Sequence, residues 1–592
     1  LEKNIKVGAR VWVSFGNKKQ ALGYVVGLSH ETKITRTKEI SFLVDREPIL
    51  DKNMLLLTKK IADYYCCSWG EAIETALPQP LRKGRRIAHI SLPVAKRKTA
   101  DRHSAMLIYD PGGKKRWDIY LEEIKTALAN DKSVIVIFPA FSSALTAKEV
   151  IAAKIDIPVS LIFRREKKQL QEWINIRSEG PRVIIGTRSC VFAPVRNLGL
   201  IIIDEEHDSV YKQEQVPHYH AVNAAFIRIK NENATLILSS ASPSVETFAL
   251  VKKNKIEYKF IGLGQDYPQI DIVGLNQQYR RGLFHKGALL AKITLDGVFA
   301  TLNAQGKVLI LLNRKGFATV AYCHSCAKTI KCPRCSVNLA YHFQEDKLIC
   351  HYCAYNMDLP KICPECNSGY IKFSGVGIEK VENEICRIFP QAKVARIESR
   401  KEISCDNADI FVATSRIIKQ SPCVFELVVV LGIDNALNRV DFRSGEYAFS
   451  LLSGLLRFTR KRIIIQTNLG KHHIFSALVS KDLERFYREE LRQRRELGFP
   501  PWRHLISIKV RGINEERVKK IAVAASEKLK GFAGYIKTVS LVTPQPARLR
   551  GSYYRHILIS TTNVLKANTA IKKVLKGVSR SGIIITVDVD PI

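Results

Sequence analysis

Residues 200–207 read Leu-Ile-Ile-Ile-Asp-Glu-Glu-His, and this stretch shows best how the chain folds. Its first four residues are apolar and mostly β-branched, which is typical of a short strand buried on both faces. Similar runs lie along the chain at 133–138, 182–186 and 235–238, with stretches of helical spacing between them. Short apolar strands that alternate with helices predict a parallel α/β sheet over about 105–250.

A second set of apolar runs follows further along the chain. These runs lie at 307–312, 410–412, 427–431 and 462–465. They have the same length and the same continuous apolar character as the first set, so they predict a second parallel sheet of the same class. The expected fold class is therefore a multidomain α/β protein with two parallel-sheet lobes.

Strand patterns also occur near both ends of the chain. Residues 10–15 and 21–26 predict a small β-rich domain at the N-terminal end. A charged helix over 481–497 is followed by Gly-Phe-Pro-Pro, which ends it. Strand patterns at 504–510 and 556–560, with a helical pattern between them, predict a small α+β domain at the C-terminal end.

Composition limits the classes of function. The chain has 592 residues, 46% hydrophobic and 25% charged, which excludes a single small module and general disorder. Lys and Arg number 93 against 56 Asp and Glu, a formal charge of +37, so a polyanion is the first partner to consider.

No apolar run reaches the roughly 18 residues of a membrane span, and no secretory signal is evident, so we expect no membrane partner and a cytoplasmic location. The first residue is Leu, which leaves open a late start, a processed chain or a non-ATG start codon.

Cysteines indicate a metal site. Eight of the 14 cysteines form four Cys-x-x-Cys pairs: Cys323/Cys326, Cys332/Cys335, Cys350/Cys353 and Cys363/Cys366. A two-residue gap lets one tight turn direct two thiolates at one ion, and eight sulfurs satisfy two tetrahedral zinc ions. Disulfides are not expected in a reducing cytosol, and four redox pairs so close together fit less well than closed structural sites. We therefore predict that two Zn²⁺ ions fold a segment too small to build its own core.

The acidic residues after the 200–203 strand are candidates for nucleotide chemistry. Ligands of α/β sheets gather at the carboxyl ends of strands, where Asp204 can hold Mg²⁺ and Glu205 can orient an attacking water. His207 follows them. This is the Walker B arrangement, although an Asp-Glu pair also follows apolar runs by chance. The strands on either side lie at the spacing found in a superfamily 2 helicase lobe.

Four features occur together in this sequence: the block at 186–225, LLNRKGFA at 311–318, the eight cysteines and RRELGFPPW at 494–502. Together they resemble the PriA family of bacterial replication-restart proteins, nearly end to end. The resemblance implies two RecA-like lobes, a two-zinc insert, an N-terminal β domain for the 3′ end of an arrested leading strand, and a C-terminal domain. It also implies a nested pairing of ligands, with one zinc held by Cys323, Cys326, Cys363 and Cys366, and the other by Cys332, Cys335, Cys350 and Cys353.

The resemblance and the patterns divide the chain into seven segments. We expect a β-rich DNA-binding domain with a helix at 1–77, a basic linker at 78–104, the first lobe at 105–270, the start of the second lobe at 271–322, the zinc insert at 323–366, the rest of the second lobe at 367–478, and the C-terminal domain at 479–592. The linker is too short for the family's winged-helix domain. Its clustered Lys and Arg fit either a solvated connector or direct phosphate contact.

The nucleotide-binding loop departs from the family. A P-loop needs Gly-x-x-x-x-Gly-Lys-Ser/Thr, because its backbone N–H groups and Lys bind phosphates and its hydroxyl holds Mg²⁺. The residues in the equivalent place are degenerate, and the nucleotide-binding candidates among them are Gly112, Gly113, Lys114, Lys115 and Arg116. Aligned with the family, Asp110 and Lys115 take the two glycine positions, Arg116 the lysine position and Trp117 the hydroxyl position. Each change weakens nucleotide binding.

The second lobe departs in the same way. Family members carry a Gln and two arginines near the γ-phosphate, where alignment places Gly454, Phe458 and either Lys461 or Arg460. Segments 413–416 and 419–422 also differ from the family's motifs, and an adenine-contacting segment is lacking. Coincident loss at the phosphate, base, metal and arginine positions predicts a pseudo-helicase that does not turn over ATP, with Asp204, Glu205 and His207 vestigial. Binding of ATP and Mg²⁺ without turnover, and a working ATP-dependent 3′–5′ DNA helicase, are the alternatives.

DNA contacts are expected at two places. The stretch 211–220 resembles the family's aromatic-rich loop, where rings stack on unpaired bases and cations follow the phosphates. The predicted DNA-binding residues are Lys18, Lys19, Tyr211, Lys212, His218 and Tyr219. An ordinary loop with satisfied Tyr and His residues is the alternative for 211–220. Expected partners are forked or single-stranded DNA, primosome and helicase-loading proteins, and single-strand-binding protein as a candidate; an RNA-binding factor is a third hypothesis.

Overall fold

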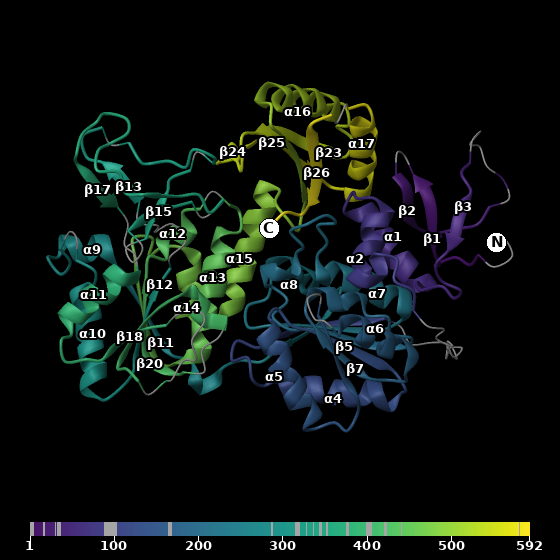
Figure 1. Ribbon diagram of the computed structural model, residues 1–592. Coiled ribbons are helices and arrows are strands. Elements are labelled where there is room, and N and C mark those ends of the chain that lie inside the picture. The colour runs from purple at the N-terminus through teal and green to yellow at the C-terminus, as the bar shows by residue number, and fades with distance from the viewer. Residues whose placement is uncertain are drawn as a thin grey trace.

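The computed structural model describes residues 5–15, 18–29, 31, 37–87, 103–163, 168–285, 288–313, 320–326, 328–335, 337–342, 346–350, 353–374, 378–397, 405, 407–419, 423–439, 441–578 and 581–592. Strands in these residues form five sheets, and Figure 1 shows two α/β lobes side by side with a smaller domain above their junction. Among the described residues, no helix is both long enough and apolar enough to cross a membrane.

The first lobe is a seven-stranded parallel sheet in the order β10-β4-β9-β8-β5-β7-β6. Its strands are β4 (Ser104–Tyr109), β5 (Ser133–Ile137), β6 (Val159–Ile162), β7 (Val183–Gly186), β8 (Leu198–Ile203), β9 (Thr235–Ser240) and β10 (Glu257–Phe260). Alternate residues of the central strands pack into two apolar clusters, one on each face. Helices α4 (Arg116–Ala129) and α5 (Phe141–Ala152) cover one face. The other face is covered by α6 (Gln169–Ser178), α7 (Ala221–Glu232) and α8 (Val245–Lys252).

The second lobe is a six-stranded parallel sheet in the order β11-β21-β20-β12-β19-β18. Its strands are β11 (Gln269–Gly274), β12 (Val308–Leu312), β18 (Val394–Arg396), β19 (Ile410–Thr414), β20 (Phe425–Leu431) and β21 (Thr459–Thr467). Its helices are α9 (Leu275–Arg280), α10 (Lys292–Asn303), α11 (Ile378–Ile388), α12 (Asp434–Leu437), α13 (Ser444–Leu455) and α14 (His473–Val479). The prediction of two parallel α/β lobes is confirmed.

An antiparallel sheet in the order β2-β1-β3 forms the N-terminal domain. Its strands are β1 (Arg10–Phe15), β2 (Lys18–Tyr24) and β3 (Ile40–Leu43), and the helices α1 (Lys52–Tyr64), α2 (Trp69–Ala76) and α3 (Gln79–Arg82) follow. Asp51 caps the N-terminus of α1, since its side chain accepts a hydrogen bond from the Met54 N–H at 2.7 Å. The predicted linker at 78–104 lies for the most part outside the described residues.

The zinc insert is a five-stranded antiparallel sheet in the order β16-β15-β14-β13-β17. Its strands are β13 (Val320–Cys323), β14 (Ala340–His342), β15 (Lys347–Ile349), β16 (Asn356–Asp358) and β17 (Ile371–Ser374). Its small core contains three of the predicted zinc-ligand cysteines, Cys332, Cys335 and Cys350. The thiols are therefore part of the packing that holds this sheet together.

Helix α15 (Leu483–Leu497) lies between the lobes and leads into the C-terminal domain. That domain has the order β23-β25-β22-β26, with β24 paired to β25. Its elements are β22 (His504–Gly512), α16 (Glu515–Lys530), β23 (Ile536–Val542), β24 (Arg548–Leu549), β25 (Ser552–Thr561), α17 (Val564–Lys576) and β26 (Ile583–Val589). This is the βαββαβ arrangement of ferredoxin-like domains, so the predicted α+β domain is confirmed.

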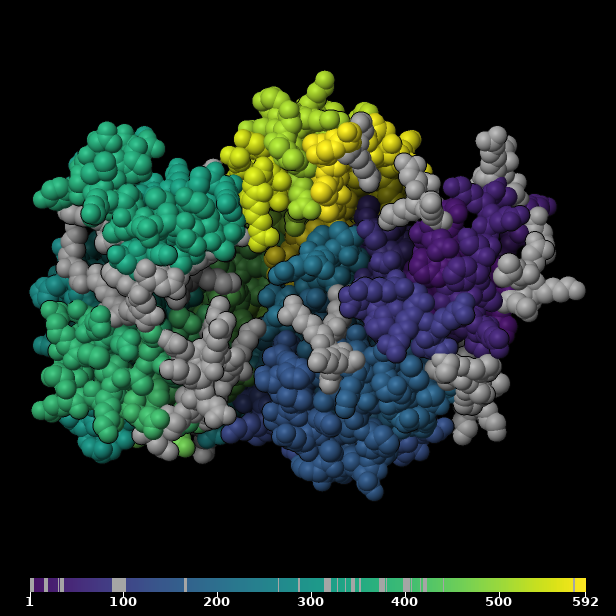
Figure 2. Space-filling model, in the orientation of Figure 1, coloured from purple at the N-terminus to yellow at the C-terminus, as the bar shows by residue number. Residues whose placement is uncertain are grey.

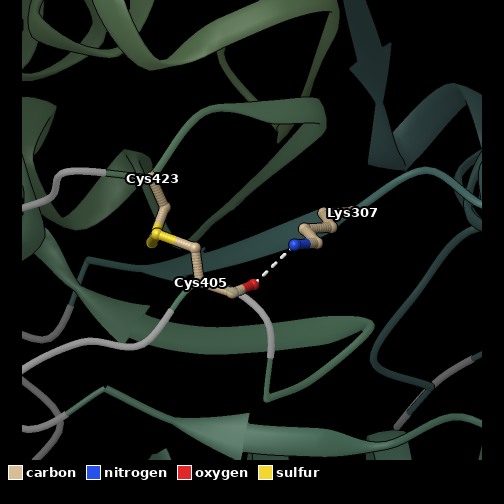
Figure 3. The surroundings of a disulfide bond; sticks show 3 residues. All are labelled: Lys307, Cys405 and Cys423. Atoms are coloured by element: carbon tan, nitrogen blue, oxygen red, sulfur yellow. Dashed lines mark hydrogen bonds between the residues drawn. A yellow bond between two sulfur atoms is a disulfide. The ribbon is translucent and has the colours of Figure 1, made fainter.

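One cysteine pair corrects the expectation that the chain has no disulfide. Cys405 and Cys423 are bonded, with their Cα atoms 5.5 Å apart (Figure 3). Cys405 precedes β19 and Cys423 precedes β20, and both strands lie beside β12. Because parallel strands begin at the same edge of a sheet, residues 18 apart in sequence are brought together. The Lys307 ammonium at the same edge donates to the Cys405 carbonyl at 2.7 Å.

Alkylation of denatured, unreduced protein is expected to leave Cys405 and Cys423 unmodified, and prior reduction should expose both to the reagent. Because the bond closes a loop of this length, Cys405→Ser should lower the free energy of unfolding by about 3 kcal/mol without reductant. Peptide mapping and denaturation with and without dithiothreitol measure the two effects. Cys386→Ser, at an exposed thiol, is the control; equal alkylation of all cysteines before reduction contradicts the bond.

Candidate functional site

The acidic residues after β8 lie at the carboxyl edge of the first sheet, beside the end of β9. Asp204 accepts a hydrogen bond from the Tyr120 hydroxyl at 2.8 Å. It also pairs with the Arg116 Nε at 3.1 Å, and Glu205 pairs with the Arg116 Nη2 at 2.8 Å. Both acids of the Walker B sequence are therefore held by groups of this same chain.

Arg116 is the first residue of α4 and is 3% exposed. The turn between β4 and α4 fixes its position, because the Asp110 carboxylate accepts the Arg116 backbone N–H at 3.0 Å. The Asp110 carbonyl accepts the N–H of Gly113, whose φ of 73° is favourable for glycine. The Arg116 guanidinium, which alignment with the family places at the lysine position of a P-loop, thus points at the two carboxylates.

A second arginine reaches the same carboxylate from the other lobe. The Arg457 Nη1 lies 3.1 Å from the Glu205 Oε1, and its Nη2 donates to the Ile418 carbonyl at 2.5 Å. Arg457 follows α13, so Glu205 lies between guanidinium groups of two lobes. Sequence alignment missed this residue because it assigned the neighbouring Phe458 to an arginine position.

The remaining aligned positions of the second lobe do not face the acidic residues. Phe458 is 8% exposed and belongs to the apolar cluster between the lobes. Arg460 lies 3.7 Å from Glu426. A Cβ atom at Gly454 would lie 2.7 Å from the Ile418 Cγ2, so the site has no room for a larger side chain there. The arginine that approaches the acidic residues from the second lobe is therefore Arg457, which the alignment did not place at either arginine position.

The pKa values of the two carboxyls differ because of these contacts. Burial raises the pKa of Asp204, although Arg116 opposes the shift. Burial would also raise the pKa of Glu205, but Arg116, Arg457 and His207 together hold it well below its ordinary value. Glu205 is therefore a buried carboxylate anion whose charge is balanced by the two guanidinium groups.

The other predicted nucleotide-binding residues lie in the turn before α4, beside the ion cluster of Arg116, Asp204, Glu205 and Arg457; a Cβ atom at Gly113 would lie 3.7 Å from the Arg457 Nη1. Lys114 and Lys115 are exposed in the turn with Gly112 and Gly113. The Trp117 ring stacks on Phe138 with centroids 6.1 Å apart and belongs to the first lobe's apolar cluster. The Trp117 indole, which alignment places at the hydroxyl position of a P-loop, therefore packs into the apolar core of the first lobe.

His207 and Glu206 make different contacts. The His207 Nδ1 lies 2.6 Å from the Ser240 Oγ and 3.5 Å from Glu205, which links the ends of β8 and β9. Glu206 points away and accepts hydrogen bonds from the Ser244 N–H at 2.6 Å and the Thr247 hydroxyl at 2.9 Å, at the start of α8. Burial raises the pKa of Glu206 to about 7.

Further ion pairs join the two lobes. Glu446 of α13 accepts the Val245 N–H of α8 at 2.9 Å and pairs with Arg494 of α15 at 2.7 Å. Arg443 of the second lobe pairs with Glu246 of the first at 2.9 Å. Arg494 also lies 3.5 Å from Glu246 of the first lobe, and because it is 2% exposed its ion pairs are largely protected from screening by salt.

Four predicted DNA-binding residues of the 211–220 loop, Tyr211, Lys212, His218 and Tyr219, are buried in this structure. Tyr211 and Tyr219 are fully buried, and the Tyr211 hydroxyl donates to the Ile137 carbonyl at 3.1 Å. Lys212 is 8% exposed and pairs with Asp588 at 3.1 Å, and the His218 Nδ1 lies 3.1 Å from the Gln213 carbonyl. Among these side chains, Lys212 joins the first lobe to β26. Lys18 and Lys19 lie in β2, but their side chains are outside the described residues.

A cleft lies where the lobes, α1 and the C-terminal domain meet. Its volume is about 2640 Å³, and its lining includes exposed Phe141 and Lys253 together with Arg188, Arg439 and His504. Figure 2 shows the C-terminal domain, in yellow, above the junction of the lobes and against the zinc insert, in teal. The lining also contains several acidic residues, so the cleft offers both charges and aromatic rings.

The eight cysteines form two clusters with the nested pairing that the resemblance implies. One holds Cys323, Cys326, Cys363 and Cys366, and the other holds Cys332, Cys335, Cys350 and Cys353. Sulfur distances include 3.5 Å for Cys323 and Cys366 and 3.6 Å for Cys332 and Cys353. Four sulfurs at about 2.3 Å from a tetrahedral centre lie about 3.8 Å apart, so both clusters fit a Zn²⁺ ion.

Two α/β lobes meeting at an acidic strand end, with a cysteine-rich insert, define a protein of the superfamily 2 helicase class. The chain matches family models at residues 1–78 for the PriA 3′ DNA-binding domain, at 332–357 for the PriA DNA helicase Cys-rich region, at 495–592 for the primosomal protein N C-terminal domain, and at 119–250 for the DEAD/DEAH box helicases.

Whole-chain relatives agree with these matches. Replication restart protein PriA of Bacillus subtilis is 30% identical over 550 residues, which cover 87% of this chain and 67% of the relative. Replication restart protein PriA of Treponema pallidum is 27% identical over 637 residues, which cover 99% of this chain and 95% of the relative. The chain belongs to the PriA family of replication restart proteins.

The raised pKa of Glu206 predicts a pH dependence of stability. Between about pH 4.5 and 7 the folded state binds more protons than the unfolded state, so this group's contribution to stability falls as pH rises, by about 3 kcal/mol in all. Glu206→Gln has no titrating group at this position, so the stability of the variant relative to the wild type should be higher at pH 8 than at pH 5. Thermal unfolding at both values measures this gain. Glu257→Gln, at an exposed site, is the control; a pH-independent difference contradicts the assignment.

Proposed function

We propose that this protein binds stalled or forked DNA and takes part in primosome assembly during replication restart without unwinding the DNA. The ion cluster carries the proposal. Arg116 already occupies the carboxylates that would bind Mg²⁺ and orient water, and removing one partner of a buried ion pair costs about 3–5 kcal/mol. A nucleotide would have to displace this arginine before its metal ion could bind.

Other features of the second lobe support the same proposal. Ile418 closes the space around Gly454, where the family carries a Gln near the γ-phosphate. The interlobe ion pairs of Arg443 and Arg494 hold together two lobes that a motor must move apart and close in each cycle. These contacts favour a fixed scaffold over a motor.

DNA recognition is assigned to the N-terminal domain, on the match of residues 1–78 and the formal charge of +37. The cleft beside the aromatic-rich loop is a second place for a single strand, because exposed Phe141 and Lys253 line it. Primosome and helicase-loading proteins are the proposed partners, with single-strand-binding protein as a candidate. This role places the protein in the cytoplasm.

An active ATP-dependent 3′–5′ DNA helicase is the second candidate. It is favoured by the intact Asp204, Glu205 and His207, and by Arg457, which reaches Glu205 from the other lobe as an arginine finger would reach a phosphate. In that case Arg116 would release the carboxylates when nucleotide binds.

Steady-state ATP hydrolysis, measured with and without forked DNA, tests the proposal. We expect no hydrolysis above that of a Glu205→Gln variant, and we expect wild-type protein to bind the fork in the same buffer. DNA binding shows that the preparation is folded. Hydrolysis that forked DNA stimulates many-fold and that Glu205→Gln abolishes would establish the helicase alternative.

Zinc is assigned to both cysteine clusters, with two ions per chain. Metal analysis of protein purified without chelator should give two equivalents of zinc. Because the insert has only a small core, removing the metal should unfold it and make residues 320–374 sensitive to protease. Metal-free protein with an intact insert would contradict a structural role.

A further inference from the structure

A small hairpin of the C-terminal domain reaches the zinc insert. Strand β24 pairs with the start of β25, with Leu549 opposite Ser552, so Arg550 and Gly551 form the two-residue turn. Their φ angles of 49° and 80° are both positive, as a type I′ turn requires. Figure 1 shows β24 extending from the C-terminal domain toward the insert.

The tip of this hairpin, residues 548–551, touches one cysteine cluster directly. The Arg550 N–H donates to the Cys335 Sγ at 3.5 Å. The Gly551 N–H donates to the Arg334 carbonyl at 3.4 Å, within the Cys332/Cys335 turn that presents the two thiols. The Leu549 side chain packs against the apolar core that contains Cys332, Cys335 and Cys350. Three successive residues of the hairpin therefore cover the cluster of Cys332, Cys335, Cys350 and Cys353.

The other cluster has a different environment. One of its thiols, Cys363, accepts the N–H of Glu365 at 3.4 Å, a residue of the insert itself. Cys366 is exposed. The Cys335 thiol thus accepts an N–H from the C-terminal domain, whereas the Cys363 thiol accepts one from the insert itself. The second cluster also has a ligand, Cys366, that is exposed to solvent.

A zinc ion with four thiolate ligands carries excess negative charge, which N–H donors to sulfur stabilise. Groups that hydrogen-bond to metal ligands change metal affinity by about 10- to 100-fold when they are removed. An apolar side chain over the site also limits access of water and chelators. The hairpin supplies both effects to one cluster, from a domain more than 150 residues further along the chain.

We propose that the 548–551 hairpin is the outer wall of the Cys332/Cys335/Cys350/Cys353 site, so that the C-terminal domain retains zinc there and the bound zinc holds the C-terminal domain to the insert. The proposal rests on the assignment of zinc to both clusters. Because such coupling is reciprocal, loss of zinc from this site loosens the hairpin, and loss of the hairpin contact weakens the site.

Zinc release from the full-length, zinc-loaded protein tests the proposal. A chromogenic chelator in excess should release zinc in two phases, and Leu549→Asp should accelerate one of them about 10- to 100-fold while leaving the other unchanged. Leu565→Asp, at an exposed leucine on α17 of the same domain, is the matched control and should leave both phases as in the wild type. Unchanged release from Leu549→Asp overturns the hairpin proposal and leaves zinc binding intact. Wild-type protein with one zinc or none overturns the zinc assignment itself.

Hydrogen exchange gives a second measurement that needs no variant. Amides of 548–556 should exchange slowly in the zinc-loaded protein and faster once the chelator has removed the metal. Exchange in 564–576 of α17 should not change. Equal exchange of the hairpin with and without zinc overturns the proposal.

Discussion

The architecture of the two lobes depends on how the buried carboxylates after β8 are neutralised. Asp204 and Glu205 lie where the apolar strand ends, and burial disfavours their charges unless cations lie beside them. Arg116 from the first lobe and Arg457 from the second supply those cations. The relative position of the lobes therefore follows in part from one carboxylate that needs both arginines. The cations that balance Asp204 and Glu205 in this structure thus come from the chain itself.

Helix α15 extends this constraint from the ion cluster to the rest of the molecule. Its Phe486 ring stacks on Phe449 of the second lobe with centroids 3.9 Å apart, and its Tyr487 hydroxyl donates to the Pro243 carbonyl of the first at 2.9 Å. Arg494 on the same helix pairs with Glu446. Apolar and charged contacts on one helix thus join both lobes to the domain that follows.

Local patterns were sufficient for the sheets and for the four Cys-x-x-Cys pairs, because both are encoded over a few residues, whereas the nested pairing of these turns into two clusters came from the family resemblance. Contacts between residues far apart in the sequence cannot be predicted from such local patterns. The Arg457 contact with Glu205 joins residues 252 apart in sequence. The buried Tyr211 hydroxyl likewise donates to the carbonyl of Ile137, at the end of β5. The bond between Cys405 and Cys423 depends on which strands are neighbours in the sheet. The sequence identifies these residues, but the contacts that each one makes depend on the three-dimensional arrangement of the strands and lobes.

The contact between α1 and the last strand has a consequence for synthesis. The Tyr64 hydroxyl donates to the Asp590 carboxylate at 3.0 Å across 526 residues of sequence. Asp588, two residues earlier and within β26, pairs with Lys212 of the first lobe. While the ribosome is still making the chain, the lobes can fold as they emerge, but this junction has to wait for the final strand. Until then the tyrosine, the lysine and their neighbours remain open to water and to chaperones.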